Sequence, residues 1–268
     1  GVVSSVAMTE PHAGSDVGAM KTTAVRDGDD YIVNGQKCFI TMAPLADYIT
    51  LFAKTGKDGK RGVDNISCMI VDMKSPGITL GGHEKMMGQR GTPHADIFFD
   101  NVRVPVANRM GEEGKGFLSC MHILDLNRPT VAASAVGVAQ GAFDIAVAYA
   151  KERKAFGKAI GEFQGIQFML ADMHMQIEAA RALLYKCTRA IDAGQLDRLT
   201  EMASMVKCFC TDTAMKVTTD AVQILGGHGY VRGNHVERMM RDAKVLQIYE
   251  GTNQIQRMVI ARRALGLR

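Results

Sequence analysis

One acidic residue stands in a setting that could support acid–base chemistry. The segment "QIYEGTNQIQR", Gln247–Arg257, places Glu250 between Tyr249 and Gly251, and Thr252 follows. Thr252 is predicted to cap a helix, so Glu250 would lie just outside a helix N-terminus, where the dipole and free amides favour an anion. Burial raises a carboxyl pKa and a helix N-terminus lowers it, so the balance could tune a base.

Three roles stay open for Glu250 on this local pattern. It could be a surface acid that complements the helix dipole, a partner for an arginine, or a base aimed into a cleft. The segment alone favours the surface acid. The large apolar neighbours Ile248 and Tyr249, and the room for a ligand that Gly251 leaves, argue for the base.

A second candidate is the loop "MTEPHAGSDVG", Met8–Gly18. Its hydroxyls, small residues and glycines would let backbone amides approach an anionic or polar ring edge closely. A Gly/Ser-rich turn by itself is usually only a turn.

The sequence lacks the motifs of several other kinds of functional site. The seven histidines show no HxxxH or HExxH spacing and no Cys/His quartet forms, so no metal site is predicted. There is no GxSxG elbow, and the glycine clusters neither follow a strand nor open a βαβ unit, which excludes Rossmann and P-loop readings. The six cysteines show no CxxC spacing, so we expect free thiols in a reducing compartment.

The composition is that of an ordinary globular protein. The chain has 268 residues, of which 47% are hydrophobic and 22% charged, and its net charge of +4 is interspersed. No Lys/Arg block indicates nucleic-acid binding. We find no run of about 18 apolar residues that would span a membrane, and the N-terminal stretch is unlike a secretory signal, so an intracellular protein is expected.

Two halves with different patterns must position these residues. Up to about Pro105, β-rich runs alternate with turn signals, which predicts a small antiparallel sheet or barrel domain over residues 1–107. The predicted strands are Asp30–Thr41, Asp47–Lys54, Ile66–Met73 and Ala95–Val104. Asn34-Gly35 reads as a tight turn and residues 54–62 as a polar loop.

The second half, residues 108–268, is predicted to be a helical bundle. An apolar stripe with steps of four and three residues runs from Ile166 to Cys187 and ends at Ala193-Gly194. Further helices are expected over Gly116–Lys154, bent at Pro129, over Leu199–Leu225, over His235–Leu246, and over Asn253–Leu265.

Six motifs in order resemble the acyl-CoA dehydrogenase family across essentially the whole chain. They are "MTEPHAGSD", "NGQKCFIT", "MGQRGT", "ERKAFGK", "QILGGHGY" and "RDAKVLQIYEGTNQIQR". The resemblance implies a middle β-domain followed by a four-helix bundle, with FAD bound by both, and α,β-dehydrogenation of an acyl-CoA thioester in fatty acid β-oxidation. Glu250 matches the base that removes the α-proton, while hydride passes to the flavin.

The resemblance also implies cofactor-binding residues. Met8, Thr9, Gly14 and Ser15 would line the flavin edge, and Phe39, Ile40 and Thr41 would cover the isoalloxazine ring. Residues matching those that hold the diphosphate and adenosine of FAD bound to a neighbouring subunit are Arg153, Phe156, Gln164, Gln223, Gly226 and Gly227. Thr252 and Gln254 would contact the flavin of the same subunit as Glu250.

Substrate contacts are implied in "LDLNRP", Leu124–Pro129, where Asp125, Asn127 and Arg128 would face the CoA portion, as would Ser15. Gly251 leaves room for the thioester. Some branches of the family carry the base as a glutamate at the position of Asn127. This chain keeps Glu250 instead, so it resembles the short- and medium-chain straight-chain branch.

The resemblance further implies an electron-transferring flavoprotein as electron acceptor, a homodimer or homotetramer, and a bacterial cytoplasmic or mitochondrial matrix location. Family members carry an N-terminal helical domain that this chain does not supply, so we expect a fragment or a truncated relative. Two other readings stay open: an acyl-CoA oxidase, and a non-catalytic remnant that retains the fold for flavin binding or oligomerisation.

Overall fold

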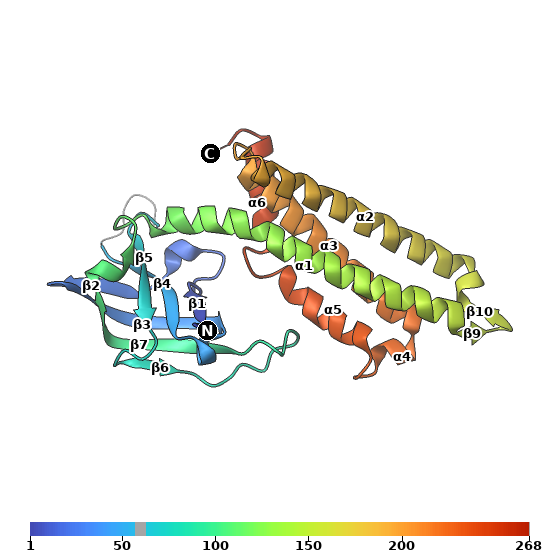
Figure 1. Ribbon diagram of the computed structural model, residues 1–268, viewed down its shortest axis with the longest axis horizontal. Helices are drawn as coiled ribbons and strands as arrows, with labels where there is room; N and C mark the ends of the chain where they lie inside the picture. The colour runs from blue at the N-terminus through green and yellow to red at the C-terminus, as the bar shows by residue number, and fades with distance from the viewer. Residues whose placement is uncertain (57–62, 268) are drawn as a thin grey trace. The chain divides into compact units, whose positions relative to one another are not determined.

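The structure is a computed structural model that describes residues 1–56 and 63–267 (Figure 1). The chain folds as two compact units. The sheet unit comprises Gly1–Met86 and Arg90–His122, and the helical unit comprises Met87–Gln89 and the chain from Ile123 onward. The predicted fold class, a β domain followed by a helical domain, is confirmed. The predicted boundary between residues 107 and 108 stays a prediction.

The sheet unit contains one eight-stranded sheet with the order β6-β7-β3-β2-β4-β5-β8, and β1 lies beside β4. The strands are β1 (Ser4–Ala7), β2 (Thr23–Asp27), β3 (Asp30–Thr41), β4 (Tyr48–Lys54), β5 (Ile66–Asp72), β6 (Ile78–Leu80), β7 (His94–Pro105) and β8 (Arg109–Met110). The four predicted strands are confirmed as β3, β4, β5 and β7. The other four have five residues or fewer, too short for a clear alternating pattern.

The sheet is mixed, which corrects the expectation of a purely antiparallel one. β1 pairs with Tyr48–Leu51 of β4 in parallel, and Thr23 of β2 pairs with Lys54 further along the same strand, also in parallel. Residues 8–22 connect β1 to β2, a length that permits consecutive strands to run in the same direction. This connection contains the candidate loop Met8–Gly18, and the sheet fixes both ends of the connection.

Asn34-Gly35 is not a turn, which corrects the second expectation. β3 runs without a break from Asp30 to Thr41, and its pairing with β7 shifts register between Val33 and Gly35. A Cβ on Gly35 would lie 2.5 Å from Thr22 Oγ1, so glycine is needed there for close backbone packing. The hairpin turn lies instead at Gly28-Asp29, between β2 and β3. Most of the predicted polar loop at 54–62 lies outside the described residues.

The helical unit is built from long helices. They are α1 (Gly116–Glu152), α2 (Gln164–Asp192), α3 (Leu199–Leu225), α4 (Gly227–Tyr230), α5 (His235–Leu246) and α6 (Asn253–Ala264). Within the described residues five helices have twelve residues or more, which confirms the five helices that the sequence predicts. Helix α1 continues through Pro129, and the predicted bend there stays a prediction.

The remaining regular elements are short. They are the hairpin β9 (Lys154–Ala155) and β10 (Lys158–Ala159), and the 3₁₀ segments η1 (Val17–Ala19), η2 (Ala43–Leu45), η3 (Val106–Asn108) and η4 (Ile160–Glu162).

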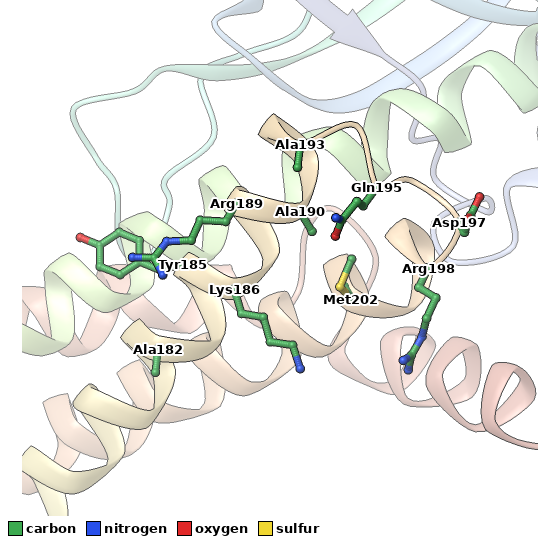
Figure 2. A pocket seen from close by; sticks show the side chains of 10 residues that line it. All are labelled: Ala182, Tyr185, Lys186, Arg189, Ala190, Ala193, Gln195, Asp197, Arg198 and Met202. Carbon is green, nitrogen blue, oxygen red and sulfur yellow. The ribbon is translucent and has the colours of Figure 1, made fainter.

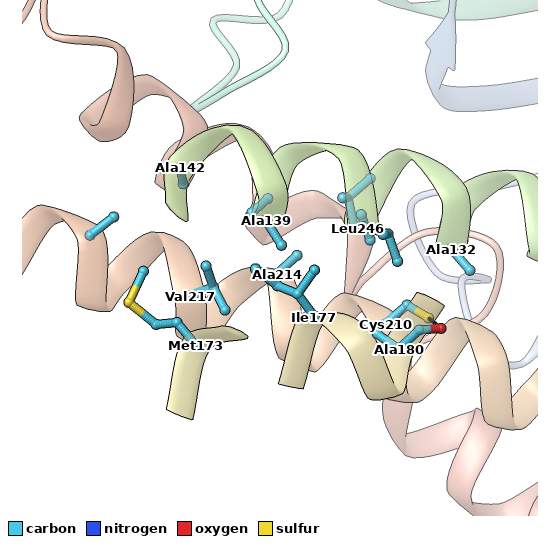
Figure 3. Close-up of a cluster of buried hydrophobic side chains, with 14 of the residues drawn as sticks. Ala132, Ala139, Ala142, Met173, Ile177, Ala180, Cys210, Ala214, Val217 and Leu246 are labelled. Carbon is cyan, nitrogen blue, oxygen red and sulfur yellow. Dashed lines mark hydrogen bonds between the residues drawn. The ribbon is translucent and has the colours of Figure 1, made fainter. Parts of the chain in front are cut away.

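The predicted stripe on α2 forms part of the helical core (Figure 3). Met173, Ile177 and Ala180 are fully buried against alanines of α1 and against α3. Alanine on the facing helix allows a close approach of the backbones, and each fully buried large side chain contributes about 1.5–3 kcal/mol. The helix ends as predicted, because Gly194 has a φ of +68° and its N–H donates to the carbonyl of Ile191.

Helix α1 has the length and apolarity of a candidate membrane span, with a mean hydropathy of 1.6 over its most apolar window. This finding differs from the expectation that the chain holds no apolar run long enough to span a membrane. The same helix contributes buried residues such as Ala132, Ala139 and Ala146 to the helical core. A core helix passes the same test of length and composition, so the finding is weak evidence for a membrane span.

Candidate functional site

The Glu250 loop connects α5 to α6 through a sharp turn. Glu250 has a φ of +57° and Gly251 a φ of +86°, both in the left-handed region. The φ of Gly251 favours glycine, and a Cβ there would also require the Gln256 side chain to move. Thr252 caps α6 as predicted, because its hydroxyl accepts a hydrogen bond from the Ile255 N–H at 3.3 Å. A non-glycine residue in the left-handed region is often found at a functional site.

The two carboxylate oxygens of Glu250 have different surroundings. Asn127 Nδ2 donates to Oε1 at 3.1 Å. Oε2 is buried and has no hydrogen-bond partner within the described part of the chain. Burial raises the pKa of Glu250, and the Asn127 hydrogen bond and the charges of Arg128 and Lys207 oppose this rise. The arrangement can hold one oxygen in place while the other accepts a proton.

The predicted substrate residues Asp125, Asn127 and Arg128 lie together on α1 beside this loop. Arg128 is buried and its Nη1 donates to Asp125 Oδ1 at 2.5 Å, while Thr200 Oγ1 donates to the other Asp125 oxygen at 2.5 Å. Arg128 Nε also donates to the Glu250 carbonyl oxygen at 3.3 Å. The structure therefore brings these three residues together with Glu250 and Gly251.

The sequence analysis did not identify Lys207 and Gln256, which hold the same loop through hydrogen bonds to its backbone. Lys207 Nζ on α3 donates to the Gly251 carbonyl at 2.8 Å and to Asn253 Oδ1 at 2.8 Å. Gln256 Nε2 donates to the Gly251 carbonyl at 3.1 Å. The sequence does contain a signal for Lys207. This lysine lies four residues after Ala203 on the buried stripe of α3, where a charged residue interrupts the apolar pattern.

The candidate loop in the sheet unit is held by a buried ion pair that the sequence reasoning also missed. Lys37 Nζ on β3 donates to Glu10 Oε1 at 2.8 Å and to the Met8 carbonyl at 3.0 Å, and Cys38 N–H donates to the Thr9 carbonyl at 2.9 Å. Although burial alone would raise it, the pKa of Glu10 is lowered by Lys37 and by hydrogen bonds. Met8 and Thr9 are half-buried, whereas Gly14 and Ser15 are exposed.

Phe39, Ile40 and Thr41 lie at an irregularity in β3. The pairing with β7 shifts register between Lys37 and Ile40, and Phe39 has a φ of +56°. This geometry leaves the Phe39 ring 58% exposed while Ile40 packs into the core. A bulge that turns an apolar ring outward commonly marks a functional position.

A third set of predicted residues lies at the other end of the helical unit. Arg153, Gly226 and Gly227 line one cavity of about 560 Å³. Phe156 stands at the tip of the β9–β10 hairpin with a φ of +51° and is 96% exposed. The remaining predicted positions in this set are exposed, namely Gln164 at the start of α2 and Gln223 near the end of α3. Gln254 is exposed in the first turn of α6.

A larger cavity of about 880 Å³ lies between the end of α2 and the start of α3 (Figure 2). Its walls include Tyr185, Lys186 and Arg189 of α2 and Arg198 just before α3. None of the residues predicted from the sequence as catalytic, cofactor-binding or substrate-binding lines it. Arg198 is engaged by Glu201, at 3.0 Å for both nitrogen–oxygen pairs.

The cysteines are free and buried, which confirms the prediction of free thiols. Burial raises the pKa of Cys38 and Cys68 to about 11, so these thiols are poor nucleophiles. Over residues 1–56 and 63–267 no group of three His, Cys, Asp or Glu side chains is placed to hold a metal ion.

Both units match described protein families. Residues 5–102 match "Acyl-CoA dehydrogenase, middle domain" and residues 114–265 match "Acyl-CoA dehydrogenase, C-terminal domain". Together the two matches cover most of the chain.

Individual proteins show the same likeness. The chain is 49% identical to cyclohexane-1-carbonyl-CoA dehydrogenase of Geobacter metallireducens over 96% of its length and 67% of that protein. It is 49% identical to the caffeyl-CoA reductase–Etf complex subunit CarC of Acetobacterium woodii, over 95% and 66%. The solved structure of butyryl-CoA dehydrogenase from Megasphaera elsdenii is 44% identical and superposes with a TM-score of 0.94 over 98% of this chain and 68% of that one. The chain thus spans about two thirds of the length of these relatives.

Proposed function

The chain belongs to the acyl-CoA dehydrogenase family of FAD-dependent oxidoreductases, and on this premise we propose that it converts an acyl-CoA thioester to the trans-2-enoyl-CoA, with Glu250 as the base. The observation that carries the proposal is the buried Oε2 atom of Glu250, which has no hydrogen-bond partner within the described part of the chain. An unpaired buried carboxylate oxygen is costly, and a proton from a substrate carbon would satisfy it.

The residues present fit FAD. The outward-turned Phe39 ring and the nearly fully exposed Phe156 ring both suit stacking on planar groups. Arg153 beside the cavity at Gly226 and Gly227 suits a diphosphate, because it combines a fixed positive charge with glycines that allow a close approach. When bound, FAD supplies the acceptor for the β-hydrogen, which leaves as hydride.

The residues around the loop define the proposed proton transfer. Asn127 fixes Glu250 Oε1, so Oε2 is the atom that takes the α-proton. The proton next to a thioester is only weakly acidic, so charge that develops on the carbonyl needs a donor. The Glu250 N–H makes no hydrogen bond within the described residues, and we assign it that role. Arg128 and Gln256 both donate to the Glu250 carbonyl oxygen and so hold the backbone next to this amide.

The experiment that tests the function is anaerobic bleaching of the flavin. The purified protein should be yellow from bound FAD. Butyryl-CoA or octanoyl-CoA, added with no other reagent, should bleach this colour. Rapid reoxidation of the bleached protein by air would favour an oxidase. A colourless protein that FAD cannot reconstitute would exclude both enzymes and leave the non-catalytic remnant.

The rate of bleaching should rise with pH, with a midpoint above the ordinary pKa of glutamate, because Glu250 must be ionised and burial raises its pKa. Replacing Asn127 with alanine removes a hydrogen bond that favours the carboxylate, so the midpoint should move to still higher pH. Stopped-flow bleaching over a pH series measures both midpoints. A midpoint in Asn127→Ala equal to or below that of the wild type would contradict this account.

Phe156→Ala should weaken FAD binding about tenfold, since stacking of an aromatic ring on a base contributes roughly 1–3 kcal/mol. The free energy of unfolding should change by no more than about 0.5 kcal/mol, because the side chain is exposed. Titration of the apoprotein with FAD gives the affinity. Phe168→Ala, which removes an exposed ring on α2, is the matched control and should leave the affinity unchanged. Equal affinities in the two variants would refute the role of Phe156.

The relatives support an acyl-CoA substrate and an electron-transferring flavoprotein as acceptor. One relative is named a dehydrogenase of cyclohexane-1-carbonyl-CoA, and another is a subunit of a complex with Etf. We extend the substrate class and the acceptor to this chain as part of the proposal. The homodimer or homotetramer and the cytoplasmic or matrix location stay predictions.

A further inference from the structure

Lys207 is a buried cation for which the proposed reaction has no direct use. Its exposure is 0%, and among the described residues no carboxylate lies within ion-pair distance of it. Its ammonium instead donates to two neutral oxygens, the Gly251 carbonyl and Asn253 Oδ1, at 2.8 Å each. Burying a charge without a paired carboxylate is unfavourable, so such a residue needs a reason to be there.

Both acceptors belong to the segment that presents Glu250. The Gly251 carbonyl closes the turn in which Glu250 and Gly251 have left-handed backbones, and this conformation persists only when its surroundings hold it. Asn253 is the first residue of α6, and its Oδ1 also accepts from Thr211 Oγ1 at 3.2 Å. Lys207 therefore ties the end of the turn and the start of α6 to the middle of α3.

The charge of Lys207 acts on Glu250 as well. The charged groups that act on the Glu250 carboxylate are Arg128 from α1 and Lys207 from α3, and both favour its ionised form. The groups that act on Lys207 itself are Cys208, Arg128, Asp212 and Glu250. Burial lowers the pKa of Lys207 to about 8, so the side chain is still mainly a cation at neutral pH.

We propose that Lys207 is the positioning residue of the base: its hydrogen bonds to the Gly251 carbonyl and to Asn253 Oδ1 hold the turn that presents Glu250. This inference rests on the proposed function for its catalytic consequence. Its structural part, the holding of the turn, stands on the contacts of Lys207 alone.

The test compares Lys207→Met with the wild type in the FAD-loaded protein. The matched control is Lys216→Met, which removes a lysine from the exposed face of the same helix, where it pairs with Asp220 at 2.8 Å. The first readout is hydrogen exchange of the backbone amides in the Glu250 segment without substrate. Exchange there should rise about tenfold in Lys207→Met, as expected for the loss of buried hydrogen bonds, and should not change in Lys216→Met.

The second readout is anaerobic bleaching over a pH series. The limiting rate in Lys207→Met should fall about 10²-fold, the scale expected when a reacting group is misplaced by about 1 Å, and the midpoint should move to higher pH. FAD content should stay equal to that of the wild type. If Lys207→Met does not fold, Lys207→Gln keeps one donor and removes the charge, and the shift of the midpoint then carries the test.

The outcomes separate the two claims. Unchanged exchange in Lys207→Met would overturn the inference, and so would faster exchange with wild-type bleaching at a wild-type midpoint. A rate loss that only follows a loss of FAD, with no shift of the midpoint, shows a merely structural role and also overturns it. A wild type that acyl-CoA does not bleach refutes the proposed function, and hydrogen exchange still decides whether Lys207 holds the turn.

Discussion

Glu250→Gln should slow bleaching of the flavin by acyl-CoA about 10²- to 10⁴-fold, the usual contribution of a positioned general base. Glutamine has nearly the same shape, so FAD content should not change. The amide cannot take a proton from the substrate, although Asn127 and Arg128 still lie around the loop. Single-turnover bleaching under anaerobic conditions measures the rate directly and separates it from reoxidation.

A control for folding follows from the same residue. Because burial raises the pKa of Glu250 in the folded protein, its contribution to stability is full below the ordinary glutamate pKa and is lost as pH rises through the raised value. At neutral pH the buried carboxylate is charged, which costs free energy of folding. Glu250→Gln removes this cost, so the variant should be at least as stable as the wild type. Glu178→Gln, at an exposed site on α2, should leave both rate and stability unchanged. Continued turnover by Glu250→Gln would refute the assignment of the base.

Arg128→Met should lower the free energy of unfolding by about 3–5 kcal/mol, because it leaves the buried Asp125 carboxylate without its cation. The Glu250 carbonyl also loses a donor. Thr200 still donates to Asp125, which keeps the loss within this range. Denaturant unfolding followed by the helical circular dichroism signal reports on the helical unit.

Two further variants make that measurement decisive. Arg198→Met breaks an exposed ion pair on the same unit and should cost about 1 kcal/mol or less. Adding Asp125→Asn to Arg128→Met removes the uncompensated charge, so the double variant should be more stable than Arg128→Met alone. A double variant that is less stable would show that Arg128 stabilises the fold mainly through contacts other than the one with Asp125.

The long elements could be predicted because their signals are local. The stripe on α2, the cap at Thr252 and the strand Asp30–Thr41 follow from periodicity and from neighbouring residues, and all three are confirmed. Asn34-Gly35 misled the prediction because its turn preference is also local, whereas its role is set by the close approach of Thr22, the residue just before β2. The parallel pairing of β1 and β2 with β4 likewise depends on partners distant in sequence.

The same distinction, between local patterns and contacts of residues distant in sequence, applies to the candidate site. The sequence by itself determined the family, the order of a sheet unit and a helical unit, and the presence of an acid before a capped helix, because these are carried by motifs and short-range patterns. Only the tertiary structure decided that one oxygen of Glu250 is held and the other is unpaired, and that the buried Lys207 ties down its loop. Asn127 and Arg128 lie more than 120 positions from Glu250, so folding alone brings them to it. Local patterns favoured a surface acid, and burial among these distant partners is what makes Glu250 suitable as a base.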